Sequence, residues 1–187
     1  MPLTPLHVAY VWPLKWRFKH LSFSALTLGS IIPDLEIPVM YFAGLSPSRL
    51  VTHSLLGAFT IDLLITLIFM KVLSAIKIDR FGVNGFNKYK VDVCVIYSAL
   101  IGSLTHVSID LMHHEHNPIF WPFGPKYIGS PLFNLVGSPR ADTISALVSL
   151  LILVYVVKRA LNSQGYGLSL IFSQPVKALS LVTSALS

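Results

Sequence analysis

The residues best suited to chemistry lie in a short stretch between Leu104 and His116. The stretch holds four histidines and two carboxylates, and it ends a long apolar run. If it is helical, His106, Asp110 and His113 stand at positions i, i+4 and i+7 and therefore share one face. Side chains one helical turn apart can reach the same divalent ion, because metal–ligand bonds are about 2 Å long. The pattern predicts a metal site, and its alternative is a polar helix end that faces water.

The composition is that of a membrane protein. Of the 187 residues, 53% are hydrophobic and only 12% are charged, against roughly 25% charged residues in soluble domains. A water-soluble surface needs more charge, so we expect an all-α polytopic bundle whose partner is the lipid bilayer. The net charge of +6 comes from short basic clusters between apolar runs, which is typical of cytoplasmic loops and does not indicate nucleic-acid binding.

Four or five apolar helices must position the candidate ligands. We expect one helical membrane domain over residues 1–187, with the metal-site core in 1–123 and a peripheral loop, a further span and a tail in 124–187. The expected spans are residues 21–45, 49–76, 91–112 and 142–157, and the tail forms either an interfacial helix or a poor span. Pro33 and Pro38 should break the first span.

The distribution of basic residues predicts where the ligands lie in the membrane. The basic segments 15–19, 77–90 and 158–159 can all be cytoplasmic if each span crosses once. At 1.5 Å per residue, Asp34, His106 and His53 then lie roughly 20, 22 and 27 Å from the inner ends of their spans. Segments far apart in the sequence therefore deliver imidazole and carboxylate groups to one level near the extracytoplasmic face of the cell membrane.

These residue types suit catalysis by a metal ion. Imidazole and carboxylate ligands without cysteine favour Zn²⁺ and also admit Mn²⁺ or Fe²⁺. The groups outnumber the needs of one ion, so both a one-ion and a two-ion centre are open, and two-ion centres catalyse in-line displacement at phosphate. The candidate general bases are Glu36 and Glu115. The candidates to hold a phosphate are Arg49, Lys126 and Arg140.

Two residues do not fit the estimate of depth in the membrane. His7 precedes the first basic cluster, so spacing alone predicts a histidine in the first turn of a proline-capped helix and not a ligand. Asp62 lies nine residues beyond His53, on the opposite face of the helix and roughly 13 Å deeper. We expect Asp62 to pair with a buried polar group or to stay protonated, although it could equally mark a proton path.

Four motifs in order resemble a known family, the prokaryotic membrane-bound metal-dependent hydrolases. The resemblance covers about residues 1–123, and its order of His, Asp, His and His-x-x-x-Asp is more distantly similar to the zinc-dependent phospholipase C and single-strand nuclease superfamily. The motifs are Thr4-Pro5-Leu6-His7, the segment 29–36, the segment 52–57, and His106-x-x-x-Asp110 followed by His113-His114.

The resemblance implies a set of metal ligands that includes His7. The ligands are His7, Asp34, His53, His106 and Asp110, completed by His113 or His114. It favours a membrane-embedded hydrolase that acts on a phosphoester or lipid-linked substrate. The alternatives are an ion or proton transporter that uses Asp62, and a structural or regulatory protein in which a metal only ties helices together.

Overall fold

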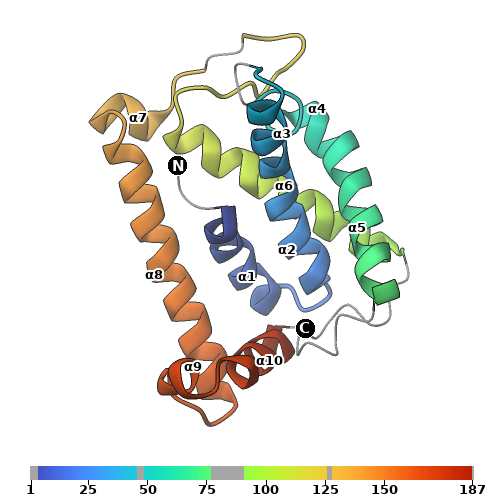
Figure 1. Ribbon diagram of the computed structural model, residues 1–187, viewed down its shortest axis with the longest axis vertical. Helices are drawn as coiled ribbons and strands as arrows, with labels where there is room; N and C mark the ends of the chain where they lie inside the picture. The colour runs from blue at the N-terminus through green and yellow to red at the C-terminus, as the bar shows by residue number, and fades with distance from the viewer. Residues whose placement is uncertain (1–3, 46–48, 77–90, 126–127, 187) are drawn as a thin grey trace.

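The computed structural model describes residues 4–45, 49–76, 91–125 and 128–186 (Figure 1). These residues form helices joined by turns and extended connections, and no strand occurs among them. The predicted all-α bundle is confirmed, since four helical segments are long and apolar enough to cross a membrane. These segments are Phe23–Phe42, Leu55–Ala75, Val93–His113 and Arg140–Ser163.

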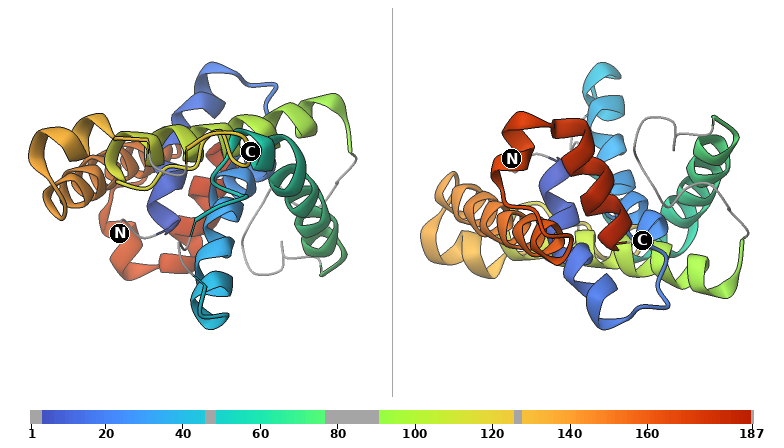
Figure 2. Two further views of the ribbon diagram at one scale, coloured as in Figure 1. Left: turned by 90° about the horizontal axis from the view of Figure 1, so that it is seen from above. Right: turned by 90° about the horizontal axis from the view of Figure 1, so that it is seen from below.

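Two of these segments present apolar side chains to the outside. Helix α5 (Leu63–Ile76) and helix α8 (Arg140–Ser163) stand at opposite margins of the bundle (Figures 1 and 2). Leu64 on α5 is 60% exposed and Leu151 on α8 is 69% exposed. Such broad apolar surfaces are unfavourable in water and suit contact with lipid.

The first span is broken where the prolines predict. Helix α2 (Phe23–Ile31) passes into the 3₁₀ turn η2 (Ile32–Leu35) and then into α3 (Glu36–Phe42). Pro38 is the third residue of α3, where its missing N–H costs little because the first N–H groups of a helix lack intrahelical partners. The tightened turn places the carboxylate of Asp34 inside the bundle.

Helix α6 (Val93–His113) crosses α2 closely, and this crossing sets the position of His106. Asp92 caps α6 by accepting a hydrogen bond of 2.8 Å from the backbone N–H of Val95. A Cβ atom at Gly102 would lie 2.5 Å from the carbonyl oxygen of Leu26, so only glycine permits this approach. His106 follows Gly102 by about one turn of the helix.

The second span begins later than predicted. Ser54 caps the short helix α4 (Leu55–Gly57), which continues through the π-helical turn η3 (Ala58–Asp62) into α5. His53 therefore lies in the connection before the helix, and not on a helix starting at residue 49 as expected. Asp62 is fully buried and accepts a hydrogen bond of 2.7 Å from Ser103 of α6, which is the polar pairing expected for it.

The N-terminal helix lies within the bundle. The 3₁₀ turn η1 (Thr4–His7) leads into α1 (Val8–Arg17), which packs against α2 and α8. After α7 (Pro131–Val136) and α8, the chain ends in α9 (Ser169–Ser173) and α10 (Pro175–Leu186). With 12 residues, α10 is too short to span a bilayer, and it packs against α8 and α9 instead.

Candidate metal centre

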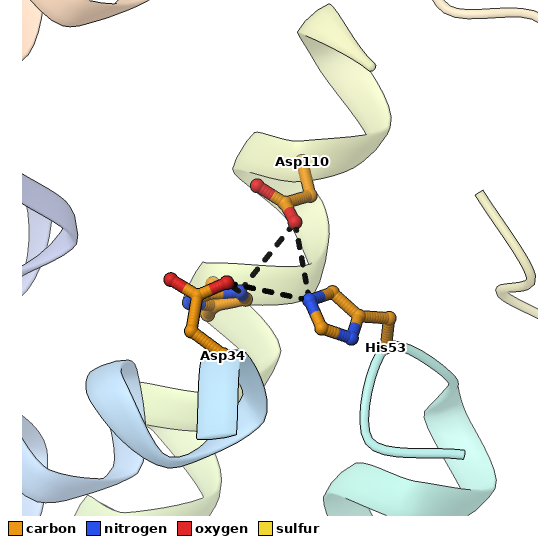
Figure 3. Close-up of side chains that lie close together, drawn as sticks. Asp34, His53 and Asp110 are labelled. Carbon is orange, nitrogen blue, oxygen red and sulfur yellow. Dashed lines mark ion pairs between the residues drawn. The ribbon is translucent and has the colours of Figure 1, made fainter. Parts of the chain in front are cut away.

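Four buried side chains converge from three parts of the chain. Asp34 comes from η2, His53 from the connection before α4, and His106 and Asp110 from α6 (Figure 3). The Nε2 atom of His53 lies 3.5 Å from Asp34 Oδ1 and 3.5 Å from Asp110 Oδ2. The Nε2 atom of His106 lies 3.5 Å from the same two oxygens.

The spacing of these atoms fits one divalent cation. Ligand atoms at tetrahedral angles, with bonds of about 2.1 Å, stand about 3.4 Å apart, close to the four separations of 3.5 Å. Nε2 of His53, Nε2 of His106 and both oxygens of Asp110 are buried without a hydrogen-bond partner. Buried polar atoms rarely lack partners, and a divalent cation at this position would satisfy all of them. We call Asp34, His53, His106 and Asp110 the first cluster.

The outer nitrogens of the histidines are held by the surrounding chain. Nδ1 of His106 lies 2.8 Å from the carbonyl oxygen of Ser30, to which it can donate. Nδ1 of His53 lies 3.3 Å from Glu36 Oε2. Each contact fixes the proton on Nδ1 and leaves the lone pair of Nε2 to face the cluster, as is usual for metal-bound histidines.

Glu36 is held by hydrogen bonds to the chain that precedes α4, and its role as a general base stays a prediction. Its carboxylate accepts hydrogen bonds from the backbone N–H groups of Leu50 and Val51, both at 2.9 Å, and from the hydroxyl of Thr52 at 2.8 Å. His53 is a fourth contact, and three of the four contacts fall on Oε2, with Oε1 accepting from Val51. Glu36 thereby positions His53.

A second cluster adjoins the first and shares one residue with it. Asp110, His113 and His114 place ligand atoms within 4.8 Å of one another. Oδ1 of Asp110 lies 3.5 Å from Nε2 of His114 and 3.9 Å from Nε2 of His113. Nδ1 of His113 faces the carbonyl oxygen of Ile109, and Nδ1 of His114 lies 3.2 Å from Oδ1 of Asp142. Asp142 was not singled out from the sequence, where its place at the start of an apolar run only suggested a helix end.

His7 lies against the first cluster, where the resemblance puts it, although spacing alone predicts only a histidine at the start of the N-terminal helix. The ring of His7 stacks on His106 at a centroid distance of 4.1 Å, and its Nε2 lies 3.6 Å from Oδ1 of Asp110. The estimate of depth missed His7 because it placed the whole N-terminal helix outside the membrane, whereas α1 packs beside α2. Burial, followed by the charge of His106, lowers the pKa of His7 to about 4. Burial likewise lowers the pKa of His114 to about 3.

Of the three predicted phosphate ligands, the structure brings Arg49 to the site. Arg49 is buried, with Nη2 at 3.1 Å from Nε2 of His114 and Nε at 3.5 Å from Oδ2 of Asp110. Arg140 is exposed at the first residue of α8 and does not line the pocket beside the clusters. Lys126 lies outside the described residues.

A pocket of about 230 Å³ opens onto the second cluster. Arg49, His113 and His114 contribute to its wall, and Glu115 is exposed at its edge. Of the two predicted general bases, Glu115 is therefore the one with a carboxylate that solvent and a substrate can reach.

Comparison with known families covers nearly the whole chain. Residues 1–185 match the family described as Domain of unknown function (DUF4184), which includes the C-terminal third beyond the recognised motifs. No curated protein matches the chain, and no solved structure matches it. These comparisons show no link to the hydrolases that the motifs resemble. A proposal of activity must therefore be based on the geometry of the site.

Proposed function

The chain belongs to the DUF4184 family, and because that family carries no assigned activity, we propose a function from the site. We propose a membrane-embedded, metal-dependent hydrolase that acts on a phosphoester or lipid-linked substrate. The proposal is carried by one observation, the first cluster. Within it, Nε2 of His53, Nε2 of His106 and the carboxylate of Asp110 are buried without hydrogen-bond partners, at separations that suit a divalent cation.

The first cluster would hold the ion through two imidazoles and two carboxylates. This ligand set favours Zn²⁺, with Mn²⁺ or Fe²⁺ as alternatives. When bound, such an ion supplies Lewis-acid activation of water and of a phosphoryl oxygen. Each of these contributions assists hydrolysis of a phosphoester.

The chain's own residues can perform the remaining tasks. The guanidinium of Arg49 offers donors to a phosphoryl group in the pocket. Hydrolysis forms a bond between water oxygen and phosphorus and breaks the ester P–O bond. Glu115 takes the proton from water, and the leaving oxygen is protonated from solvent.

The basic residues support a site near the extracytoplasmic face of the cell membrane. The guanidinium of Arg159 lies 4.6 Å from the ring centroid of Trp16, so two basic segments of the sequence meet at one end of the bundle. The connection before α4 and the C-terminal end of α6 lie at the other end (Figure 1). Basic loops remain cytoplasmic as a rule, and this supports a pocket among the headgroups of the outer leaflet.

A second candidate function follows from the same geometry. Four protein ligands complete a tetrahedral ion, which is typical of structural sites, whereas catalytic sites keep a position for water. In that case the ion would tie η2, the connection before α4 and helix α6 together without turnover.

Metal analysis combined with turnover assays tests the proposal. We expect the protein purified in detergent to contain Zn²⁺, Mn²⁺ or Fe²⁺ and to hydrolyse p-nitrophenyl phosphate, bis-p-nitrophenyl phosphate or a fluorescent phospholipid. Asp34→Asn and His106→Ala should lose both metal and activity. His20→Ala, which changes an exposed histidine far from the clusters, is the control and should retain both.

The two candidate functions give different results in this experiment. Bound metal without turnover of any of the three substrates would support the structural role. Protein without metal, even after incubation with Zn²⁺ and Mn²⁺, would contradict both candidates.

A further inference from the structure

We infer that the centre holds one divalent ion and that Arg49 occupies the place of a second cation. The inference rests on the proposed metal site. It decides between the one-ion and two-ion centres that the residue types leave open, and it assigns Arg49 a role in the metal content of the site.

Asp110 is the residue on which a two-ion centre would depend. Its Oδ2 faces His53 and His106 of the first cluster, whereas its Oδ1 faces His113 and His114 of the second. A second ion would therefore need Asp110 as a bridge. The imidazole nitrogen nearest to Oδ1 is Nε2 of His114 at 3.5 Å, followed by Nε2 of His7 at 3.6 Å and Nε2 of His113 at 3.9 Å.

The lone pair of His114 is already used. Arginine is protonated in proteins, so Nη2 of Arg49 must donate to Nε2 of His114 across 3.1 Å. The proton of His114 then lies on Nδ1, which faces Oδ1 of Asp142 at 3.2 Å. An imidazole nitrogen has a single lone pair, so His114 cannot bind an ion while it accepts from Arg49.

The first cluster differs in this respect. Nε2 of His53 and Nε2 of His106 have no hydrogen-bond partner, although both are buried. Their outer nitrogens are held by Glu36 and by Ser30, so their lone pairs point at the cluster and at nothing else. In the second cluster Nε2 of His113 also lacks a partner, but Nε2 of His114 is taken by Arg49. The hydrogen bonds of the site therefore leave every imidazole of the first cluster ready for an ion and withhold one imidazole of the second.

Charge acts in the same direction. Nη2 of Arg49 lies 3.1 Å from Nε2 of His114, and both side chains are buried, whereas Nε of Arg49 lies 3.5 Å from Oδ2 of Asp110 on the side of the first cluster. A second divalent ion on Asp110 and His114 would stand a few ångströms from a permanent positive charge, and this repulsion is poorly screened away from water. Asp110 is the only carboxylate of the second cluster, so it could not offset that repulsion alone.

Metal stoichiometry tests the inference without any assay of activity. Protein in detergent would be stripped with a chelator, reloaded with excess Mn²⁺, desalted and analysed by mass spectrometry of the metal and by electron paramagnetic resonance. We expect one ion per chain and the spectrum of isolated Mn²⁺. Arg49→Gln should rise twofold to two ions per chain with a spin-coupled spectrum, and Arg49→Gln combined with His114→Ala should return to one.

Two further variants guard against effects of charge and folding. Arg159→Gln removes an exposed arginine at the other end of α8 and should keep one ion. Arg49→Lys keeps the charge and should also keep one ion. Thermal unfolding of each variant identifies those that do not fold.

Each outcome separates the inference from the function on which it rests. Two ions in the unmodified protein would overturn the inference and leave the hydrolase proposal standing. A single ion in folded Arg49→Gln would overturn the role given to Arg49. No ion in the unmodified protein would overturn both proposals.

Discussion

Glu36 joins the metal site to the chain that precedes α4. It accepts two backbone hydrogen bonds from Leu50 and Val51 and also contacts Nδ1 of His53. The backbone bonds fix the path of the connection, and the contact with His53 fixes the orientation of the imidazole. The carboxylate of Glu36 thus holds the backbone of the connection and also keeps Nε2 of His53 facing the first cluster.

Replacing this carboxylate with an amide should weaken metal binding. In Glu36→Gln one acceptor oxygen becomes an NH₂ group, which faces donors and cannot accept from them. Loss of such a partner of a ligand typically costs 10- to 100-fold in metal affinity, and unsatisfied donors cost about 1–3 kcal/mol of stability. The measurement is competition for Zn²⁺ with a calibrated chelator.

The matched control for this variant is Glu115→Gln, which changes an exposed carboxylate at the edge of the pocket. Its Zn²⁺ affinity should equal that of the unmodified protein. An affinity of Glu36→Gln within twofold of the unmodified protein would show that Glu36 does not position His53.

At the scale of single residues, the sequence identifies the candidate metal ligands better than it identifies the side chains that contact them. His106 and Asp110 are neighbours through helix periodicity alone, and the structure does bring them together. The partnership of Arg49 with His114, by contrast, joins residues 65 positions apart. Asp142 meets His114 from another helix, so no local spacing could reveal that contact.

At the scale of elements, the crossing of α2 and α6 decides the geometry of the first cluster. Gly102 of α6 faces the backbone of Leu26 and Ser30 of α2, and small residues are what allow membrane helices to approach this closely. Ser30 also accepts the hydrogen bond of His106. Separation of α2 from α6 would therefore move the imidazole of His106 and would also open the packing between the two helices.

A methyl group at this crossing should destabilise the protein. Gly102→Ala gains roughly 1 kcal/mol from helix propensity, but overpacking typically costs about 1–3 kcal/mol. We expect a net loss of up to about 2 kcal/mol, seen as a lower midpoint of thermal unfolding in detergent, with weaker Zn²⁺ binding because His106 shifts.

Ser108→Ala is the control for this substitution, because it lies on an exposed position of the same helix. It should leave both the unfolding midpoint and Zn²⁺ affinity unchanged. A higher midpoint for Gly102→Ala would mean that propensity dominates and that the crossing is not tight.

Long elements are predictable from the sequence and their irregularities are not. The apolar run before His113 predicts α6 nearly to its ends, because burial in lipid requires an unbroken hydrogen-bonded helix. The π-helical turn at Ala58–Asp62 ends at Asp62, whose partner Ser103 lies on another helix. Packing of this kind depends on tertiary neighbours, and the same is true of α1, whose place beside α2 and α8 has no signal in hydropathy.

At the scale of the whole molecule, two basic segments of the sequence meet at the end of the bundle opposite the clusters. Helix α8 begins at Arg140 near the clusters and ends beyond Arg159, which packs on Trp16 of α1. The long axis of the bundle therefore separates the connection before α4 and the C-terminal end of α6 from the contact between Arg159 and Trp16 (Figure 1). The proposed orientation thus concerns the molecule as a unit, because every span must reverse if one does.

Labelling of single cysteines in intact cells tests this orientation. In a Cys94→Ala background, which removes the native thiol, Glu115→Cys would mark the end with the clusters and Lys158→Cys the basic end; both positions are exposed. We expect a membrane-impermeant maleimide to label the first variant in whole cells and the second only after permeabilisation, because basic segments are retained inside. The cysteine-free background controls for unspecific reaction. The opposite pattern would place the metal site at the cytoplasmic face and restrict its substrates to the inner leaflet and the cytoplasm.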